Sequence, residues 1–303
     1  MAKRIAIITD EAGWHGTQLR RAFKARGFDS SYVSLKNCRV DFDYPLHGLG
    51  IDGFGKNLPD GVFVRGISGG SFEQVTFRLD ILHTLQELGV PVYNDAGAIE
   101  RSVDKARTSL RLKQAGVDTP ATWVTEDLCA ARTLLMRESA RGNELVIKPL
   151  FGSQGSGLVR LGAGMDLPDS PEYNQLYYFQ RYIDSGEGNW HDWRVLIVGD
   201  QVQAAMIRRG TSWINNVAQG ARCESAVPDE EIVRLARKAV RAVGMDYAGV
   251  DIIRDVSGKA YVIEVNSIPA WRGLQSVTTS GIAQILVDDF VARKIHSNLE
   301  AVG

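Results

Sequence analysis

The sequence has little that would direct it to a nucleic acid, a membrane or an oxidising compartment. Its 303 residues carry 35 Lys and Arg against 36 Asp and Glu, and no basic block occurs, so we expect no nucleic-acid surface. No apolar run approaches the length that spans a bilayer, so no membrane partner is expected. Only three cysteines occur, at isolated positions that match no zinc or redox spacing. The opening MAKRIAIITDEAGWHG reads as a strand and a loop rather than a signal peptide, and we expect a cytoplasmic protein.

The hydrophobic content of 44% is enough for a sizeable core shared by two or three subdomains. Over residues 1–96, short apolar runs alternate with amphipathic helical patterns, which predicts an α/β fold class with a small open parallel sheet. We predict strands at 3–9, 31–35, 61–65 and 90–93, helices at 18–26 and 72–88, and a surface connection at 47–59.

Two loops in this part follow predicted strands. Gly13-Trp14-His15-Gly16 lacks the G-x-G-x-x-G spacing, and we predict an ordinary βα turn there. In the other loop, Arg65 ends a strand and a Gly/Ser segment containing Ser68 opens a helix. Because helix N-termini bind anions, Arg65 and Ser68 are candidates for holding a substrate carboxylate. A plain capped helix start with a surface arginine is an equally good interpretation.

Oxygen-bearing side chains stand on two apolar runs late in the chain. In YVIEVNS, Glu264 and Asn266 are two residues apart and therefore leave the same face of a strand. The preceding run GVDIIR carries Asp251, and the short segment 255–259 between the runs predicts an antiparallel hairpin. Such oxygens suit a hard cation such as Mg²⁺. A solvated sheet face would explain any one of these residues alone, but the triplet favours a metal site.

A glycine-rich loop lies between two predicted strands, 145–149 and 158–161. The first strand delivers Lys148, and glycines in the loop allow backbone N–H groups to approach phosphate oxygens closely. A strand rather than a helix follows the loop, so it is not a Walker loop. A flexible hairpin without function would explain the glycines but not the lysine.

The run K-P-x-x-G-S-x-G-x-G at 148–157, together with GVDIIR and VIEVNSIP, resembles the ATP-grasp ligases of the branch related to RimK. The resemblance covers about residues 104–296. It implies an N-terminal open parallel α/β domain (1–96) followed by a two-lobed α+β ATP-grasp fold. The central lobe with the glycine-rich flap would be 97–179, and the C-terminal lobe with the metal site would be 180–303.

The resemblance also implies roles for individual residues. The metal ligands would be Asp251, Glu264 and Asn266. The nucleotide would be bound by Lys105, Lys148, Gly152, Ser153, Gly155, Gly157, the hinge residues Gln180, Arg181, Tyr182 and Ile183, and Asp192 near the ribose. The residues facing the transferring phosphate would be Arg208 and Asn216. ATP and Mg²⁺ are the expected cofactors, with two ions expected and Mn²⁺ as an alternative.

The activity implied is ATP-dependent ligation of a carboxylate to an amine through an acyl phosphate. RimK itself carries an arginine and a serine before the asparagine that matches Asn216, where this chain has Ile214 and Asn215. The tail IPAWRGLQ (268–275) is similar to that of α-glutamate ligases acting on tetrahydromethanopterin or deazaflavin coenzymes. We therefore expect glutamate addition to a tetrahydromethanopterin-type coenzyme. Arg65 and Arg272 are candidates for binding acceptor carboxylates, although Arg272 is equally well interpreted as a surface salt-bridge residue.

Two other functions remain open. One is a LysX-like ligase that modifies the carboxylate of an acidic carrier protein or peptide, and the other is a non-catalytic nucleotide-binding regulator. The expected partners are a small-molecule carboxylate acceptor and an amino acid, glutamate in our interpretation. Members of the family that the sequence resembles are commonly dimers or tetramers, so a homodimer or homotetramer is expected.

Overall fold

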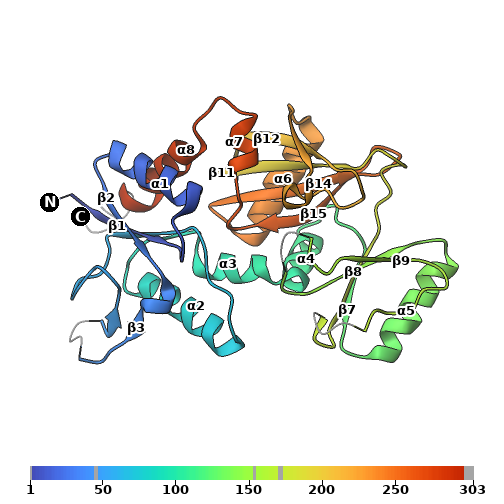
Figure 1. Cartoon of the computed structure of the whole chain (residues 1–303), viewed down its shortest axis with the longest axis horizontal. Coiled ribbons are helices and arrows are strands. Elements are labelled where there is room, and N and C mark those ends of the chain that lie inside the picture. The colour runs from blue at the N-terminus through green and yellow to red at the C-terminus, as the bar shows by residue number, and fades with distance from the viewer. Residues whose placement is uncertain (1, 44–46, 153–154, 170–172, 297–303) are drawn as a thin grey trace.

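The computed structural model describes residues 2–43, 47–152, 155–169 and 173–296. Its first sheet is parallel, with the strand order β2-β1-β5-β6. The strands are β1 (Arg4–Ile8), β2 (Asp29–Val33), β5 (Gly61–Val64) and β6 (Val92–Tyr93). This confirms the open parallel sheet that the alternating pattern predicted. Helix α2 (Phe72–Glu87) and the short helix α3 (Ala96–Val103) follow, and α3 leads toward the rest of the chain (Figure 1).

Two local predictions in this part were wrong. Residues 13–16 are not a βα turn but the first turn of helix α1 (Gly13–Ala25), because positive φ at Gly13 lets the chain turn directly into the helix. The segment 47–59 is not only a surface connection, because it contains strand β4 (Leu49–Gly50), which pairs with the preceding strand β3 (Arg39–Val40). Apolar residues spaced between its glycines are buried, namely Leu49, Ile51 and Phe54.

The second sheet is antiparallel and has the order β7-β10-β8-β9. Its strands are β7 (Thr122–Thr125), β8 (Leu145–Lys148), β9 (Val159–Leu161) and β10 (Tyr177–Arg181). Helix α5 (Leu128–Ala140) supplies Leu134 and Leu135 to the core beneath this sheet. Helix α4 (Lys105–Gln114) lies between α3 and β7 in the chain. Its N-cap is Asp104, whose side chain accepts a hydrogen bond from the Arg107 N–H.

The third sheet has the order β13-β12-β11-β14-β15. Its strands are β11 (His191–Val198), β12 (Gln201–Arg209), β13 (Arg222–Ser225), β14 (Tyr247–Arg254) and β15 (Ala260–Asn266). The residue types of Gly199-Asp200 predict a hairpin turn, and a turn there joins β11 to β12, with φ of +54° at Gly199 and +69° at Asp200. The spacing of apolar residues over 229–243 predicts an amphipathic helix, and the structure has α6 (Glu230–Val243) there, whose buried side packs on β14 and β15.

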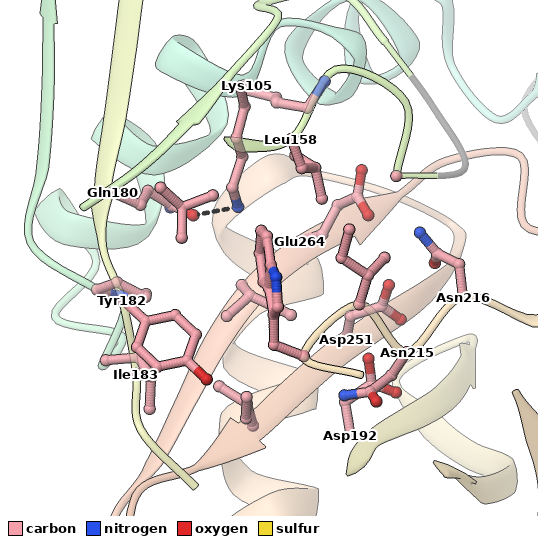
Figure 2. Close-up of a pocket in the computed structure, with 18 of the residues that line it drawn as sticks. Lys105, Leu158, Gln180, Tyr182, Ile183, Asp192, Asn215, Asn216, Asp251 and Glu264 are labelled. Carbon is pink, nitrogen blue, oxygen red and sulfur yellow. Dashed lines mark hydrogen bonds between the residues drawn. The ribbon is translucent and has the colours of Figure 1, made fainter. Parts of the chain in front are cut away.

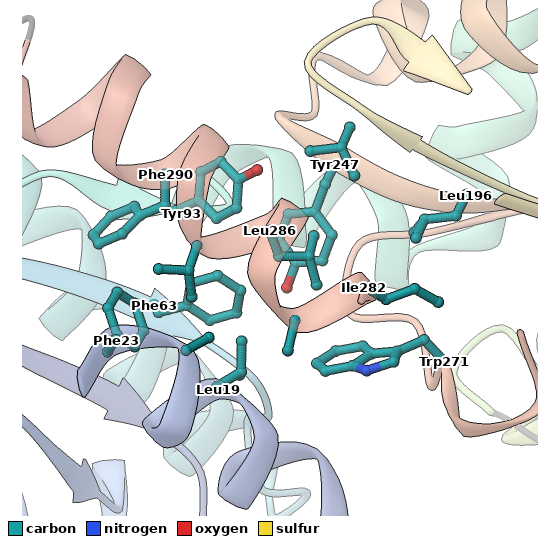
Figure 3. Packing of buried hydrophobic residues seen from close by; sticks show 14 of the residues in the cluster. Leu19, Phe23, Phe63, Tyr93, Leu196, Tyr247, Trp271, Ile282, Leu286 and Phe290 are labelled. Atoms are coloured by element: carbon teal, nitrogen blue, oxygen red, sulfur yellow. The ribbon is translucent and has the colours of Figure 1, made fainter. Parts of the chain in front are cut away.

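The end of the described chain returns to the first sheet. After α7 (Arg272–Ser276), helix α8 (Ile282–Phe290) packs against α1, and a π-helical turn (Val291–His296) follows it. A Cβ on Gly61 would lie 2.7 Å from Ile295 and 2.8 Å from Phe290, so a residue without a side chain is needed at that point in β5. Figure 3 shows Phe290 beside Phe63 and Tyr93, and the Tyr93 ring is stacked on Tyr247 with ring centroids 4.9 Å apart. Aromatic rings from the first sheet, the third sheet and the last helix therefore share one core. None of the helices described is both long enough and apolar enough to cross a bilayer.

Candidate active site

The register of β14 and β15 brings the predicted metal ligands to neighbouring positions. Asp251 is paired with Glu264 and Gly249 with Asn266, which confirms the predicted antiparallel hairpin. The register shifts next to Asp251, leaving Ile263 as an extra residue in β15. Ile263 and Glu264 both line the same pocket as a result. In Figure 2 the carboxylates of Asp251 and Glu264 both project into this pocket.

The pocket lies where the second and third sheets face each other, and most of the residues predicted for the nucleotide line it. They are Lys105, Lys148, Gly152, Gly155, Gln180, Arg181, Tyr182, Ile183, Asp192, Arg208, Asn216, Asp251 and Glu264. Gly157 is not part of the lining, and its carbonyl accepts a hydrogen bond from the Tyr173 hydroxyl at 2.9 Å. Asn266 also lies outside the lining, and Ser153 falls outside the described residues.

Two partly buried lysines supply positive charge to the pocket. The Lys148 ammonium donates a hydrogen bond to Gln180 Oε1 at 2.5 Å. Lys105 donates to the carbonyls of Leu150 and Gly152, at 3.1 and 2.9 Å, which holds it against the glycine-rich loop. Burial lowers the pKa of both lysines, that of Lys148 to about 8, while Glu264 opposes the shift. Because these ammonium groups are partly removed from water, their electrostatic attraction to an anion in the pocket is stronger than it would be on the surface.

A buried network of two arginines and two aspartates lies at the floor of the pocket. Arg208 Nε lies 2.6 Å from Asp192 Oδ1, and its Nη2 lies 3.0 Å from Asp251 Oδ2. Arg194 forms a second bidentate pair with Asp251, with Nη2 at 2.8 Å from Oδ2. Burial raises the pKa of Asp192 to about 6, and Arg208 limits this rise. Burial also acts on Asp251, but Arg194 and Arg208 outweigh it and hold that pKa below its usual value.

The sequence interpretation did not include Arg194. Arg194 and Asp192 are two residues apart on β11, and Arg194 is paired in register with Asp251. Alternation along β11 could have placed Arg194 beside Asp192, but its partner strand could not be read from the sequence. Asp192 itself, predicted near a ribose, lies against Arg208 at the metal-ligand end of the pocket.

The apolar wall of the pocket was also missed. The remaining lining residues are mostly apolar, with Ser156 and Asn215 as the polar exceptions. They are Pro120, Val146, Pro149, Ser156, Leu158, Trp213, Ile214, Asn215, Ile253 and Ile263. Trp213 stands edge-on to Tyr182, with ring centroids 6.1 Å apart, and the Arg160 guanidinium covers Tyr182 at 3.8 Å. Flat apolar surfaces of this kind suit an aromatic base. Most of these residues look like ordinary strand residues in the sequence, so no local signal marked them.

The three predicted substrate-binding residues lie away from this pocket, beside the first sheet. Ser68 bonds through its hydroxyl to Asp10. Arg65 is partly buried and lies over the Trp271 ring, 5.2 Å from its centroid. Arg272 is exposed at the start of α7. Helix α2 is capped by Ser71 in a capping box with Gln74, as the plain interpretation of this loop expects, but Arg65 is not a surface arginine.

The donor atoms at the end of β14 and β15 fit a hard divalent cation. Asp251 and Glu264 offer carboxylate oxygens from adjacent strands, and Asn266 offers an amide whose buried nitrogen has no hydrogen-bond partner. Carboxylate and amide oxygens are the ligands that Mg²⁺ takes in proteins, commonly together with substrate phosphates. The two lysines face the same space, so the pocket can hold a metal-bound polyphosphate.

Comparisons with known proteins agree with this geometry. The model of the RimK-like ATP-grasp domain matches residues 102–290. The tetrahydromethanopterin:alpha-L-glutamate ligase of Methanocaldococcus jannaschii is 37% identical over 296 residues, covering 95% of this chain and 98% of that protein. The protein with the same name from Methanococcus maripaludis is 30% identical, covering 94% and 97%. A probable alpha-L-glutamate ligase 2 from Hahella chejuensis is 30% identical, covering 95% of each chain.

Solved structures show the same fold. The ATP-grasp ligase PsnB, complexed with a phosphomimetic variant of its minimal precursor, Mg and ADP, superposes with a TM-score of 0.73 at 21% identity, covering 96% of this chain and 98% of that one. The RimK domain ATP-grasp protein from Sphaerobacter thermophilus gives a TM-score of 0.68 at 18% identity, covering 94% and 98%. Both likenesses extend over the first sheet as well as the pocket.

Proposed function

Because the chain belongs to the RimK-like ATP-grasp family, we propose that it is an ATP-dependent ligase that adds L-glutamate to a carboxylate of a tetrahydromethanopterin-type coenzyme. The observation that carries the ligase activity is the pairing of Asp251 with Glu264 in a pocket that also contains Lys105 and Lys148. Relatives named tetrahydromethanopterin:alpha-L-glutamate ligase, which match nearly the whole chain, support the choice of substrates.

The reaction has two steps that the pocket suits. A carboxylate is a poor electrophile, so one of its oxygens first attacks the γ-phosphorus of ATP, the bond to the bridging oxygen breaks, and ADP leaves. The amine of glutamate then attacks the acyl carbon, the C–O bond to phosphate breaks, and an amide, phosphate and a proton are released. The protein chiefly positions these groups and balances their charge.

The residues of the pocket divide this work. Lys105 and Lys148 bind phosphate oxygens, and Arg208 and Asn216 face the transferring phosphoryl group. Gly152, Ser153, Gly155 and Gly157 would bring backbone N–H groups to the phosphates, and Gln180, Arg181, Tyr182 and Ile183 would bind the adenine. Asp192, expected near the ribose, holds Arg208. Arg208 is already held between Asp192 and Asp251, which fixes its guanidinium before substrate binds.

Magnesium would be held by Asp251, Glu264 and Asn266, where it neutralises charge on the nucleotide phosphates. Two ions are proposed, and Mn²⁺ could replace Mg²⁺ because it accepts the same oxygen ligands. The PsnB complex with Mg and ADP has the same fold, which supports nucleotide and magnesium use in general.

The acceptor would approach from the first sheet, where Arg65, Ser68 and Arg272 are proposed to bind it. In this arrangement residues 1–96 form the N-terminal domain, 97–179 the central lobe with its flap, and 180–303 the C-terminal lobe. A homodimer or homotetramer is proposed as the assembly, and light scattering on the purified protein measures it.

The experiment is incubation with ATP, Mg²⁺, L-glutamate and reduced tetrahydromethanopterin, followed by mass spectrometry. We expect a mass increase of one glutamyl unit and ADP release that requires both the acceptor and glutamate. ADP release that instead needs an acidic carrier protein would favour the LysX-like function. Nucleotide binding without turnover under any acceptor and amine would favour a regulator and contradict the proposal.

A further inference from the structure

The order of the first sheet places a topological switch point beside Arg65. From β1 the chain passes through α1 to β2 on one side, and β5 lies parallel to β1 on its other side, so the order in which the chain adds strands reverses between β1 and β5. Ligands of open α/β sheets bind outside the carboxyl ends of the strands at such a point. Here the β1–α1 turn and the Arg65 loop meet, and the Ile8 carbonyl accepts hydrogen bonds from the N–H groups of Arg65 and Gly66 at 2.9 and 3.0 Å. We call this place the switch-point crevice, defined by His15, Arg65, Trp271 and Arg272.

Arg65 is a cation without a carboxylate partner among the residues that the structure describes. Its Nε is buried and has no hydrogen-bond partner, and no carboxylate of the described residues forms a salt bridge with it. Arg208 is bonded to two carboxylates, whereas Arg65 only lies over the Trp271 ring. Burial lowers the pKa of Arg65, which shows that its charge is poorly solvated. A buried arginine in this condition lacks an anion.

His15 adds a hydrogen-bond donor to the same crevice. The backbone N–H of Trp271 donates to His15 Nε2 at 3.1 Å, so the neutral ring carries its proton on Nδ1. Burial, together with the charges of Arg65 and Arg272, lowers the pKa of His15 to about 4 and keeps it neutral near pH 7. His15 is also in the first turn of α1, whose N-cap residue, Ala12, provides no side-chain hydrogen bond. The N-terminal N–H groups of this helix are therefore open to an anion.

Trp271 provides an independent sign that a ligand belongs here. Its side chain is wholly buried, yet the indole N–H has no hydrogen-bond partner in the described part of the chain. In Figure 3 this nitrogen lies on the edge of the ring turned away from Ile282 and Leu286, and the ring itself packs edge-on against His15 at 4.6 Å. Asp10 in the β1–α1 loop is engaged by Lys36, Ser34 and Ser68, and no salt bridge joins it to Arg65.

We propose that the switch-point crevice binds a second, non-reacting anionic group of the acceptor, a carboxylate or a phosphate, so that the enzyme selects acceptors carrying an anion besides the carboxyl to be amidated. The identity of the acceptor rests on the proposed function. Helix α7 begins at the crevice with Arg272 and packs on β12, the strand that carries Arg208. One elongated molecule can therefore lie along α7, with its distal anion at Arg65 and its reacting carboxyl toward Arg208.

The first test is the variant Arg65→Met, which keeps the length of the side chain and removes its charge. We expect the KM for reduced tetrahydromethanopterin to rise at least tenfold while the KM values for ATP and glutamate stay unchanged. The melting temperature should stay the same or rise, because an unpaired buried charge is removed. Arg65→Lys should recover part of the loss. The control is Arg20→Met, which removes an arginine from the Tyr32 ring on the outer side of α1. An unchanged acceptor KM, or a rise in the glutamate KM instead, overturns the proposal.

The second test does not need activity, so it separates this proposal from the proposed function. Thermal shifts are measured with glutarate, with valerate, which has the same number of carbons but one carboxylate, and with inorganic phosphate. Glutarate should raise the melting temperature of the wild type more than valerate does, and Arg65→Met should abolish the difference. A larger shift with phosphate, also lost in Arg65→Met, would identify the bound group as a phosphate. Equal shifts in wild type and Arg65→Met for all three probes contradict the site even if glutamylation is observed.

Discussion

Arg208 and Asp251 form a buried salt bridge across the third sheet, with Nη2 and Oδ2 3.0 Å apart and both side chains almost fully buried. The same guanidinium bonds Asp192, so one cation contacts two buried carboxylates, and Asp251 has Arg194 as a second cation. The pairing gives Arg208 a fixed position in the pocket, and it makes the fold of this region depend on a residue proposed for catalysis.

Replacing Arg208 by Met should therefore cost stability as well as activity. Removing Arg208 leaves Asp192 buried without its cation and leaves Asp251 with Arg194 alone, and the loss of one partner of a buried ion pair costs about 3–5 kcal/mol. Urea denaturation near pH 7 measures this change. The double variant Arg208→Met/Asp192→Asn should recover much of the lost stability, because the remaining carboxylate, Asp251, keeps Arg194 as its partner. Equal stability of Arg208→Met and the wild type would contradict the compensating role.

Much of the fold could be predicted because its signals are local. The hairpin of β14 and β15 follows from two apolar runs and a short turn, and the Gly199–Asp200 turn identified the β11–β12 hairpin. The first turn of α1 was misplaced because nothing in GWHG distinguishes a loop from a helix that begins on a glycine. The buried strand β4 at Leu49–Gly50 was missed because glycines between apolar residues look like a loop.

The site could be predicted only where a charged residue stands out from an apolar strand in the sequence. Lys148, Asp251 and Glu264 are conspicuous on apolar strands, and the structure brings them to one pocket. Arg194 could not be assigned because its contact with Asp251 depends on which strand lies beside β11. His15 and Trp271 are far apart in the chain, and only the return of the C-terminal segment to the first sheet joins them. Long-range packing of this kind leaves no pattern in the sequence.

The variant Glu264→Gln should lose ligase activity and keep the fold. The amide preserves shape but removes the charge that faces Lys105, Lys148 and the metal, and loss of one such contact costs about 3–4 kcal/mol of transition-state stabilisation. We expect kcat to fall by about 10²–10³-fold, with a higher Mg²⁺ requirement. Glu126→Gln, an exposed glutamate, serves as the control. Full activity of Glu264→Gln would refute the metal assignment.

Lys148 makes ATP binding dependent on pH. Its pKa is lowered to about 8 by burial, so the free enzyme carries this charge below pH 8 and loses it above. The KM for ATP should rise as the pH passes 8, reaching about tenfold by pH 9 because roughly one lysine in eleven stays protonated. In Lys148→Arg the charge persists at all these pH values, and the rise should disappear. A KM that is independent of pH in the wild type would place Lys148 away from the phosphates.

We expect the burial of neutral His15 to lower the free energy of unfolding in mild acid. Its folded pKa of about 4 lies below its unfolded value, so the unfolded chain takes up a proton between pH 6.5 and pH 4 while the folded protein does not. The free energy of unfolding therefore falls as the pH falls through this window. Relative to His15→Gln, the wild type should lose about 1–2 kcal/mol, a figure reduced for the partial exposure of the ring. Urea denaturation of both proteins at pH 7, 6, 5 and 4 measures the difference, and parallel curves would mean that His15 titrates normally.

A substitution at Gly155 can show whether the glycine-rich loop must fit closely against Asn216. It has φ of +75°, and a Cβ there would lie 2.6 Å from Asn216 Nδ2 and 2.9 Å from Ile214 Cγ2. Gly164 has nearly the same φ, +77°, but a Cβ there would have no atom within 4 Å. Alanine at either position is strained, at about 1 kcal/mol, and only at Gly155 does it also push the loop away from the pocket.

The pair Gly155→Ala and Gly164→Ala therefore separates strain from fit. Both variants should lose similar stability in urea, but only Gly155→Ala should raise the KM for ATP and lower kcat, by up to about 10²-fold for a displacement near 1 Å. Steady-state kinetics with varied ATP measures the difference. If the two variants have the same kinetic constants, contact between the loop and Asn216 is not needed for nucleotide binding, and the role of Asn216 at the phosphates must be abandoned.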